Sequence, residues 1–545
     1  MAVMNGAQAL VGSLKANGID TVFGLPGVQL DYIFDALYQE RQSIRVLESR
    51  HEQGAAYMAY GYAESTGKLG TFLVVPGPGL LNTCTALCTA QASNAPVLAL
   101  TGQIPSQYIG RGLGILHEVQ RPEAMFSSIT KTQMLADHPS RVPYVLNRSI
   151  ESAMGGRRGP ALFQVPQDVT LQRGEVTFSV AGLEPDPLPD PDLLAKAAKL
   201  LGEAKKPLIF AGGGVFGAEA ELLELAKALE APVVMTRHGR GALSDRHYLA
   251  QTFVAGHALW GDADVVLAVG TRFLESDAWG VEGLKVIRID LDPLQAEKPR
   301  AADIKLTGQA KYCLGQLANS VGAHNHKRES RETELNAAKQ AALAKLAELQ
   351  PQKQYSDAIR KALPDEGIVV AEITQIGFYG WAGFPAYRPR SIIYPGFQDS
   401  LGYGYATSLG VKVGNPDRPV VAICGDGGFM FTMPEMATAV KHGINVVAVV
   451  FNDSGFGNVR RAQKTIFEGR YIGSDLKNPD FMKLADAFGA YGQRVKTAEE
   501  LTPAIEKALA ANAPALIEVP VGAMPSWQSV MPRGNARGPS ARNKS

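Results

Sequence analysis

The chain contains 545 residues, 46% of them hydrophobic, and its 54 Lys and Arg balance 53 Asp and Glu to a formal net charge of +1. This length predicts three or four domains, and the neutral balance, without a long basic run, argues against nucleic acid or an anionic membrane as a partner. Four cysteines do not make a disulfide framework, the first residues lack a signal-peptide pattern, and no apolar run reaches about 18 residues. We therefore expect a cytoplasmic, multi-domain α/β protein.

The N-terminal third of the chain alternates helical and strand patterns. Apolar spacing predicts helices over 5–17, 51–65 and 80–92, and short apolar runs predict strands over 21–24, 44–47, 71–75, 95–102 and 160–166. Continuous apolar strands between helices are typical of a parallel sheet that is covered on both faces.

Two further α/β units follow. The segment 184–192 holds four prolines and four acids, which is typical of an extended linker. Strands are predicted after it at 207–211, 232–236, 265–270 and 286–290, then at 367–371, 419–424, 446–451 and 515–519, with an exposed helix at 327–350 between the two sets. We expect three doubly wound parallel-sheet domains, at residues 1–180, 190–345 and 355–545.

The strongest local signal is a glycine-rich turn directly after the predicted strand 419–424. Gly425, Asp426, Gly427 and Gly428 form this turn, and a helical pattern follows it. Ligands of open α/β sheets bind at the carboxyl ends of strands, where backbone N–H groups and a helix N-terminus suit a phosphate. Because Asp426 would repel phosphate, we interpret it as a ligand of Mg²⁺ or Ca²⁺ that bridges to a diphosphate. The alternative is an ordinary turn that Asp426 caps.

The next predicted strand end carries a second carboxylate. Asp453 follows the first turn after 25 intervening residues, in a glycine turn that continues through Gly455, Phe456 and Gly457. Two oxygen side chains and an exposed carbonyl can supply half of an octahedral site. This pair of motifs resembles the signature of thiamine-diphosphate (ThDP) enzymes. By that resemblance Asp426, Asp453 and the Gly455 carbonyl hold Mg²⁺, with Asp453 standing where the family usually has Asn.

The resemblance also assigns residues that would contact the cofactor. Glu52 corresponds to the family's glutamate that hydrogen-bonds the aminopyrimidine ring and so promotes loss of the thiazolium C2 proton. On the sequence alone, Glu52 could instead be an acid that favours a helix N-terminus. Leu401 corresponds to the apolar wedge that bends ThDP. The remaining cofactor-binding candidates are Pro26, Pro78, Asn82, Gln375, Gly425, Gly427, Gly428, Phe456 and Gly457.

Within this family the motifs are most similar to those of acetolactate synthases, which implies a ThDP- and Mg²⁺-dependent 2-oxoacid decarboxylase and carboligase. The residues expected to contact the substrate depart from the acetolactate synthase pattern. By spacing, His117 and Glu118 stand where acetolactate synthases have Phe-Gln and oxalyl-CoA decarboxylase has Tyr-Glu, and Gln29 stands where benzaldehyde lyase has a catalytic histidine. These three are candidate catalytic residues, although His117 and Glu118 could simply face solvent.

The departures keep two other functions open. A 2-hydroxyacyl-CoA lyase or oxalyl-CoA decarboxylase type of C–C lyase is the first alternative, and a catalytically silent regulatory subunit is the second. The central unit adds a glycine triplet at 212–214 with Asp290 and Asp292, which resembles nucleotide-binding marks, so FAD is an optional further cofactor. The resemblance implies a homodimer or homotetramer with active sites between subunits and a small-molecule substrate.

The C-terminal tail from Pro525 carries basic residues and no acid. It is interpreted either as a disordered end or as a lid in which Trp527 and Arg533 close over an anionic substrate and exclude water. Its last basic residues are Arg542 and Lys544.

Overall fold

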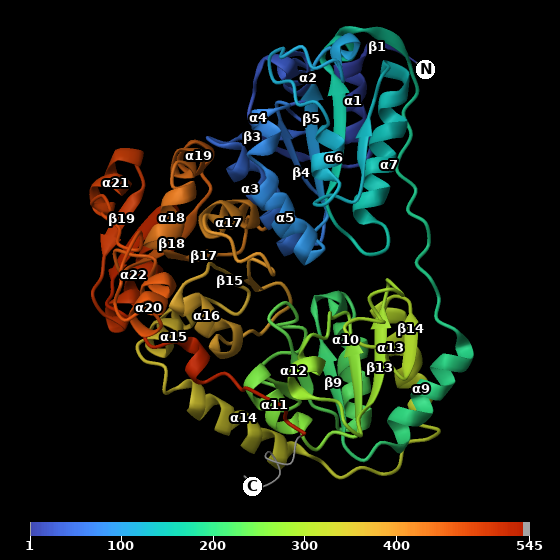
Figure 1. Cartoon of the computed structure of the whole chain (residues 1–545), viewed down its shortest axis with the longest axis vertical. Helices are drawn as coiled ribbons and strands as arrows, with labels where there is room; N and C mark the ends of the chain where they lie inside the picture. Colours follow the sequence, from blue (N-terminus) through green and yellow to red (C-terminus); the bar gives the residue numbers. More distant parts are fainter. Residues whose placement is uncertain (1, 538–545) are drawn as a thin grey trace. The chain divides into compact units, whose positions relative to one another are not determined.

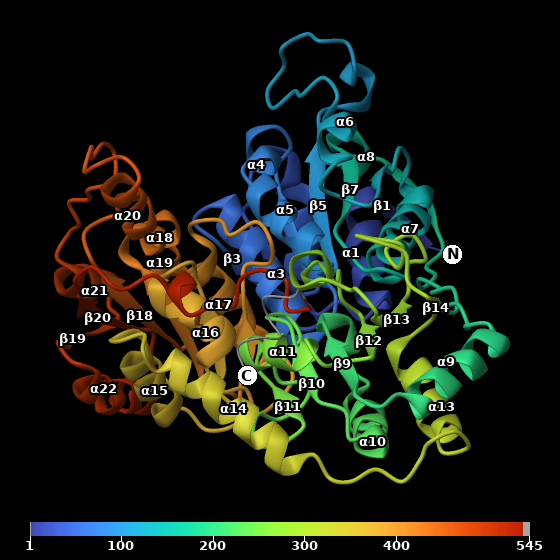
Figure 2. The same cartoon turned by 60° about the horizontal axis from the view of Figure 1, so that its bottom comes forward.

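The computed structural model describes residues 2–537 and contains three six-stranded sheets with helices on both faces (Figures 1 and 2). The residues form two compact units. The first comprises residues up to Glu184 with Gly367–Thr374 and Pro395–Gly522; the second comprises Pro185–Glu366, Gln375–Tyr394 and the described residues from Ala523. Three parallel α/β sheets confirm the expected fold class. Among residues 2–537, no helix is both long and apolar enough to cross a membrane.

The N-terminal sheet has the strand order β3-β2-β4-β5-β7-β6, and its neighbouring strands are parallel. Its strands are β2 (Thr21–Gly24), β3 (Arg45–Glu48), β4 (Gly70–Val74), β5 (Val97–Gln103), β6 (Gln133–Leu135) and β7 (Ala161–Pro166). Its helices are α1 (Gly6–Ala16), α2 (Asp31–Gln39), α3 (Glu52–Thr66), α4 (Pro78–Leu81), α5 (Cys84–Ser93), α6 (Pro122–Phe126), α7 (Val142–Met154) and α8 (Gln167–Leu171).

This domain differs from the prediction at the helix expected over 80–92, at its first strand and at β6, which was not predicted. The helix expected over 80–92 is interrupted between α4 and α5, where the Thr83 hydroxyl donates to the Leu80 carbonyl (2.7 Å) and competes with the helical bond. An antiparallel pair, β1 (Ala2–Asn5) with β8 (Arg173–Val176), was not expected.

The central sheet has the order β11-β10-β9-β12-β13-β14, again parallel. Its strands are β9 (Pro207–Ala211), β10 (Val233–Met235), β11 (Ala250–Gln251), β12 (Val265–Val269), β13 (Lys285–Asp290) and β14 (Ile304–Thr307). The helices of this unit are α9 (Pro191–Glu203), α10 (Glu219–Leu229), α11 (Phe253–Trp260), α12 (Glu275–Trp279), α13 (Ala310–Val321), α14 (Glu332–Leu346), α15 (Gln352–Ala362) and α16 (Gln375–Gly383). The helix predicted over 327–350 is present as α14 but is shorter than expected; it is exposed along most of its length and buries Leu335, Ala342 and Leu346.

The C-terminal sheet has the order β16-β15-β17-β18-β20-β19. Its strands are β15 (Ile368–Ala371), β16 (Ile392–Ile393), β17 (Val420–Gly425), β18 (Val446–Asn452), β19 (Tyr491–Arg494) and β20 (Ala515–Pro520). Its helices are α17 (Tyr403–Gly414), α18 (Asp426–Thr432), α19 (Glu435–His442), α20 (Gly457–Thr465), α21 (Phe481–Phe488) and α22 (Ala498–Ala510). Because β15, β17 and β18 are parallel neighbours, the glycine turns that follow β17 and β18 lie at one edge of the sheet.

Helices α3 and α17 of the first unit pack with their backbones in close approach. A Cβ atom on Gly410 would overlap the Met58 carbonyl oxygen, and one on Gly61 would overlap the Thr407 carbonyl oxygen. The rings of Tyr57 and Tyr403 meet edge to face beside this contact, with centroids 5.8 Å apart. The helix pair therefore joins the N-terminal and C-terminal domains through a glycine-dependent interface.

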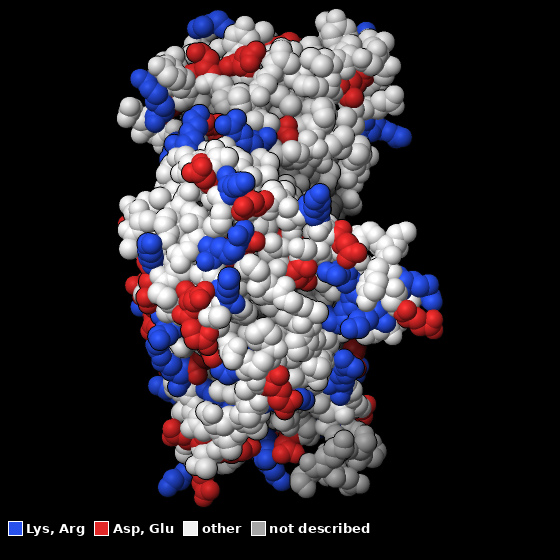
Figure 3. All heavy atoms as spheres, turned by 90° about the vertical axis from the view of Figure 1, so that its left-hand side faces the viewer, with Lys and Arg blue, Asp and Glu red and all other residues white. Residues whose placement is uncertain are grey.

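Charged side chains of both signs are interspersed on the face drawn in Figure 3. Exposed ion pairs of the protein include Lys15 with Glu40 (2.7 Å) and Arg300 with Asp277 (2.7 Å). Such exposed pairs contribute little stability each. The mixed face agrees with the net charge of +1.

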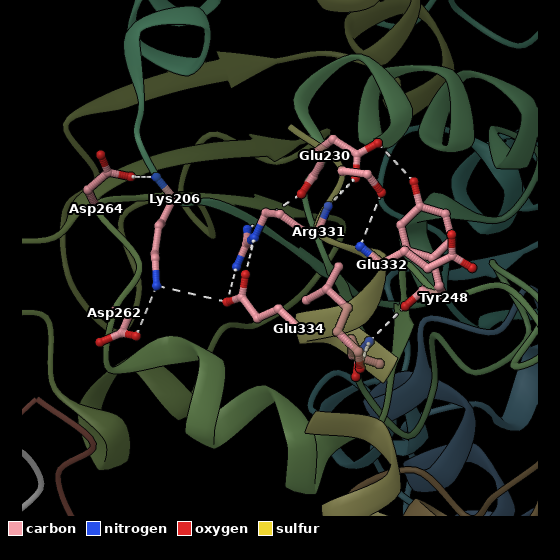
Figure 4. Close-up of polar contacts among 11 residues, drawn as sticks. Lys206, Glu230, Tyr248, Asp262, Asp264, Arg331, Glu332 and Glu334 are labelled. Atoms are coloured by element: carbon pink, nitrogen blue, oxygen red, sulfur yellow. Dashed lines mark hydrogen bonds and ion pairs between the residues drawn. The ribbon is translucent and has the colours of Figure 1, made fainter. Parts of the chain in front are cut away.

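A polar network fixes the beginning of α14 to the end of α10 (Figure 4). Glu230 accepts hydrogen bonds from the Tyr248 hydroxyl (2.9 Å) and from the Arg331 backbone N–H (3.1 Å). The Arg331 guanidinium in turn donates two bonds of 2.9 Å to Glu334, whose carboxylate also faces Lys206 at 3.9 Å. Glu230 holds this arrangement from a left-handed backbone conformation, with φ +47°. The network thus anchors the residue before α14 to the residue that follows α10.

Glu230→Ala is expected to lower the free energy of unfolding by about 1–3 kcal/mol, because Tyr248 and Arg331 lose their acceptor. Glu230→Gly loses the same bonds, but glycine adopts the left-handed backbone conformation without strain. The decrease in the free energy of unfolding should therefore be smaller by about 1 kcal/mol than for Glu230→Ala. Urea unfolding followed by circular dichroism measures both variants. Glu348→Ala, at an exposed position, is the control and should change stability by less than about 0.5 kcal/mol. Equal stability of Glu230→Ala and the control would contradict this role of Glu230.

Candidate active site

Glu52 is the first residue of α3, just beyond the end of β3. Its side chain is 13% exposed. The Asn82 amide donates to Oε2 (3.0 Å), and within residues 2–537 Oε1 accepts no hydrogen bond. The structure thus brings together Glu52 and Asn82 and leaves one carboxylate oxygen available. This acceptor fits a protonated ring nitrogen, as the aminopyrimidine of ThDP would provide.

The turn between β4 and α4 lies between Glu52 and His117. Gly77 has φ +63°, and a Cβ atom there would lie 2.6 Å from the His117 carbonyl oxygen, so this turn requires glycine. Pro78, the first residue of α4, and Pro26, which follows β2, are both exposed. These residues all follow the carboxyl ends of neighbouring parallel strands, where a ligand of an α/β sheet binds.

His117 and Gln29, both predicted from the sequence as catalytic candidates, contact each other. The His117 Nδ1 lies 2.8 Å from the Gln29 Oε1, and the Gln29 amide donates to the Leu116 carbonyl (3.3 Å). Gln29 is buried, whereas His117 is half-buried and adopts φ +69°. A left-handed conformation in a residue other than glycine stores strain and is concentrated at functional sites. The pair therefore presents a fixed imidazole beside the 77–79 turn.

Glu118 has a different environment from His117. Its carboxylate accepts backbone N–H groups from Gly112 (2.9 Å), Gly114 (2.7 Å) and Ile115 (3.2 Å). These bonds close the loop that carries His117. The side chain thus orders its own loop in this structure.

Asp426 and Asp453 lie close together at the ends of β17 and β18. Asp426 is buried, and burial together with the Asp426 charge raises the pKa of Asp453 to about 6. Two neighbouring carboxylates of this kind are stabilised by a divalent cation, so the donor set fits Mg²⁺ with oxygen ligands from elsewhere completing the site. Within residues 2–537 no three His, Cys, Asp or Glu side chains are grouped to hold a metal.

Asn478 is a site residue that the sequence did not indicate. Its amide donates to the Asp426 Oδ2 (2.6 Å) and to the Asn452 Oδ1 (2.9 Å), and Asn452 donates to Glu518 (2.8 Å). Asn478 lies in the loop before α21, without a glycine turn or strand end to mark it. It thus orients the Asp426 carboxylate from a segment 52 residues away.

The turn at 455–457, after β18, contacts the turn at 425–428, after β17. A Cβ atom on Gly427 would lie 2.7 Å from the Phe456 ring, and one on Gly457 would lie 2.7 Å from the Asp453 Oδ2. The backbone of Gly455 pairs with that of Asp475 in an isolated antiparallel β-bridge. A cavity of about 380 Å³ opens here, lined by Gly427, Met430, Phe431, Phe456, Leu476, Lys477 and Asn478. The two predicted turns therefore form one wall of a pocket.

Two other cofactor-binding candidates lie in different surroundings. Leu401 is half-buried and lies just before Gly402, the residue at φ +81° that precedes α17. Gln375 is the first residue of α16, in the second compact unit.

Glu435, also missed from the sequence, ties the C-terminal domain to the helix of Glu52. This buried carboxylate on α19 accepts the N–H groups of Arg50 (3.1 Å) and His51 (3.0 Å) and the Thr438 hydroxyl (2.7 Å). It therefore holds the two residues that precede α3 from a position 385 residues away, whereas the His51 side chain caps the helix itself. No hydrogen bond in the described part of the chain joins Glu52 itself to Asp426 or Asp453.

In the second unit, the predicted nucleotide marks have structural partners. A Cβ atom on Gly214 would lie 2.7 Å from Gly270, so the triplet allows two strand-end turns to meet. The carboxylates of Asp290 and Asp292 each accept a backbone N–H in the following turn, at 3.0 and 2.9 Å. These contacts within the protein explain why glycine and aspartate stand at these positions, whether or not a nucleotide binds.

The tail packs within the same unit as far as Arg537. Trp527 stacks on Phe378 with centroids 5.5 Å apart, and Val530 is buried. Arg533 donates to the Gln528 carbonyl at 3.1 Å. Arg542 and Lys544 lie outside the described residues.

Comparisons with known proteins point to the same enzyme family along nearly the whole chain. Family profiles described as the N-terminal TPP binding, central and C-terminal TPP binding domains of thiamine pyrophosphate enzymes match residues 4–127, 194–317 and 372–519. The chain is 32% identical to the acetolactate synthase of Arthrospira platensis, over 95% of this chain and 94% of that protein. It is 34% identical to the acetolactate synthase large subunit of Mycobacterium tuberculosis, over 95% and 88%.

A relative with a different name matches equally well. The probable 2-ketoarginine decarboxylase of Pseudomonas aeruginosa is 33% identical, over 95% of this chain and 94% of that protein. Three profile matches in the expected order, with identities above 30% along nearly the whole chain, show that it belongs to the thiamine pyrophosphate (ThDP) enzyme family.

Proposed function

We propose that this ThDP-dependent enzyme is a Mg²⁺-dependent 2-oxoacid decarboxylase and carboligase of the acetolactate synthase type. It would act on pyruvate or a related 2-oxo acid and release CO₂. The observation that carries the proposal is the arrangement of Glu52 with an open Oε1 beside the 77–82 turn, in a chain whose relatives include acetolactate synthases. The 2-ketoarginine decarboxylase relative supports decarboxylation of a 2-oxo acid as the shared step.

The proposed roles follow from the contacts. ThDP supplies a nucleophilic carbon and an electron sink when bound. Glu52 would hold the proton of the aminopyrimidine nitrogen, with Asn82 keeping its carboxylate in place. Asp426 and Asp453, with the Gly455 carbonyl, would hold Mg²⁺ between the protein and the diphosphate, and Asn478 would orient Asp426.

At the substrate end, we assign His117 as the proton-transfer residue and Gln29 as its partner. Glu118 is assigned to ordering the 112–118 loop, because three backbone N–H groups occupy its carboxylate. The cofactor contacts of Pro26, Pro78, Gln375, Leu401, Gly425, Gly427, Gly428, Phe456 and Gly457 belong to the same proposal.

A substrate panel tests the reaction. The purified chain with ThDP and Mg²⁺ is incubated with pyruvate, longer and basic 2-oxo acids, and 2-hydroxyacyl-CoA or oxalyl-CoA thioesters, and products are identified by mass spectrometry. We expect CO₂ with acetolactate or acetoin from pyruvate, and loss of turnover on chelation of Mg²⁺. Cleavage of a thioester with no turnover of any 2-oxo acid would overturn the proposal in favour of the lyase.

The proposal has three further parts, and measurements are given for the assembly and for FAD. We propose domains at 1–180, 190–345 and 355–545, and a homodimer or homotetramer in which active sites lie between subunits; light scattering gives the assembly. FAD in the central domain stays a prediction, and a visible absorption spectrum of the purified protein tests it.

A further inference from the structure

Glu372 is a buried carboxylate immediately after β15, at the strand end next to the Asp426 turn. Its hydrogen bonds come from backbone groups of two distant segments. Oε1 accepts the N–H groups of Gly402 (3.0 Å) and Gly404 (3.3 Å), and Oε2 accepts that of Gly425 (3.3 Å). Burial raises the pKa of this carboxyl to about 7, against the opposing effect of these N–H groups.

The two segments approach Glu372 as closely as glycine permits. A Cβ atom on Gly404 would lie 2.9 Å from the Glu372 Cβ, and one on Gly428 would overlap the Glu372 carboxylate. Gly402 adopts φ +81°, so the backbone direction just after Leu401 depends on this turn. A single carboxylate therefore connects the Leu401 segment to the glycine-rich turn after β17.

We propose that Glu372 is a positioning residue for ThDP, which fixes the Leu401 segment relative to the 425–428 turn. This inference rests on the proposed assignment of Leu401 and that turn to cofactor binding. Glutamine has the same shape but only one carbonyl oxygen, so its amide N–H₂ would face an N–H donor of either the 402–404 or the 425 segment. One segment would then shift, and the bent cofactor would fit less well.

Glu372→Gln tests the proposal by calorimetric titration of ThDP into the full-length apo-protein with Mg²⁺. We expect the Kd for ThDP to rise about tenfold or more, because a hydrogen bond to a buried carboxylate is lost. Calorimetry separates Kd from the fraction of protein that binds. An unchanged Kd with a reduced binding fraction would show a merely structural role and overturn the proposal.

Asp264→Asn is the matched control. Asp264 accepts the backbone N–H groups of Lys205 (2.6 Å) and Lys206 (2.9 Å) in the second unit, so the substitution removes the same kind of bond. Figure 4 shows the contact of Asp264 with Lys206. The Kd for ThDP should not change. If Glu372→Gln does not fold, Glu372→Asp keeps the charge but is too short to reach both segments, and we expect its Kd to rise severalfold; no rise would overturn the proposal.

Asp426→Asn distinguishes failure of this inference from failure of the proposed site. If it weakens ThDP binding while Glu372→Gln and Glu372→Asp do not, the site stands and the role of Glu372 is wrong. If Asp426→Asn leaves the Kd unchanged, the cofactor is not held at this turn, and the role of Glu372 falls with that assignment.

Discussion

Glu52→Gln is expected to reduce turnover by at least about 100-fold while the protein still folds and binds ThDP. The side chain is 13% exposed and the Asn82 amide contacts only Oε2. Glutamine keeps the shape of the side chain but cannot hold or exchange a proton at the aminopyrimidine nitrogen. Two measurements follow the effect: turnover of 2-oxo acids, and hydrogen–deuterium exchange at C2 of bound ThDP, read by NMR after acid quenching.

The control for Glu52→Gln is the same substitution at Glu40. Glu40 is on the surface, paired with Lys15 at 2.7 Å, and exposed ion pairs contribute little. Glu40→Gln should therefore match the parent enzyme in both measurements. A Glu52→Gln protein that exchanges the C2 proton at the parent rate would remove Glu52 from the activation step, whatever its effect on overall turnover.

The buried strands of all three sheets were predictable because both faces of each are covered. Strands such as β9 and β17 are runs of apolar residues, which the sequence shows directly. The edge strand β3 was predicted over 44–47, but the edge strands β6, β11, β14, β16 and β19 were missed, because a short strand at the edge of a sheet lacks such an apolar run. β19 (Tyr491–Arg494) and β6 (Gln133–Leu135) are short and partly exposed, so their pattern does not differ from that of a loop.

The glycine turns of the site were predictable from local sequence, whereas the residues that hold them were not. The Asp426 turn is marked by its own glycines after an apolar strand. Asn478, Glu372 and Glu435 act across separations of 52, 53 and 385 residues, and nothing beside them in the sequence indicates their partners. The contact of His117 with Gln29, 88 residues away, likewise appears only in the fold.

Gly410→Ala is expected to lower the free energy of unfolding by about 3 kcal/mol, a large effect for one methyl group. Gly410 lies within α17, where its Cβ would overlap the Met58 carbonyl oxygen of α3. Neither atom belongs to a flexible side chain, so the helices must separate. The separation also affects the Gly61 contact with Thr407. The midpoint of urea unfolding, with the slope checked for constancy, measures the loss.

Gly315→Ala separates this packing effect from helix propensity. Gly315 also lies inside a helix, α13, but its nearest neighbour is the Glu221 Cγ at 3.7 Å, an ordinary van der Waals distance. Alanine favours helix over glycine by about 1 kcal/mol, so this variant should be slightly more stable than the parent. We therefore expect Gly410→Ala to lower the free energy of unfolding and Gly315→Ala to raise it slightly. If Gly410→Ala also stabilised the protein, α3 and α17 could not be packed at backbone distance in solution, and this glycine contact would no longer join the C-terminal domain to the helix of Glu52.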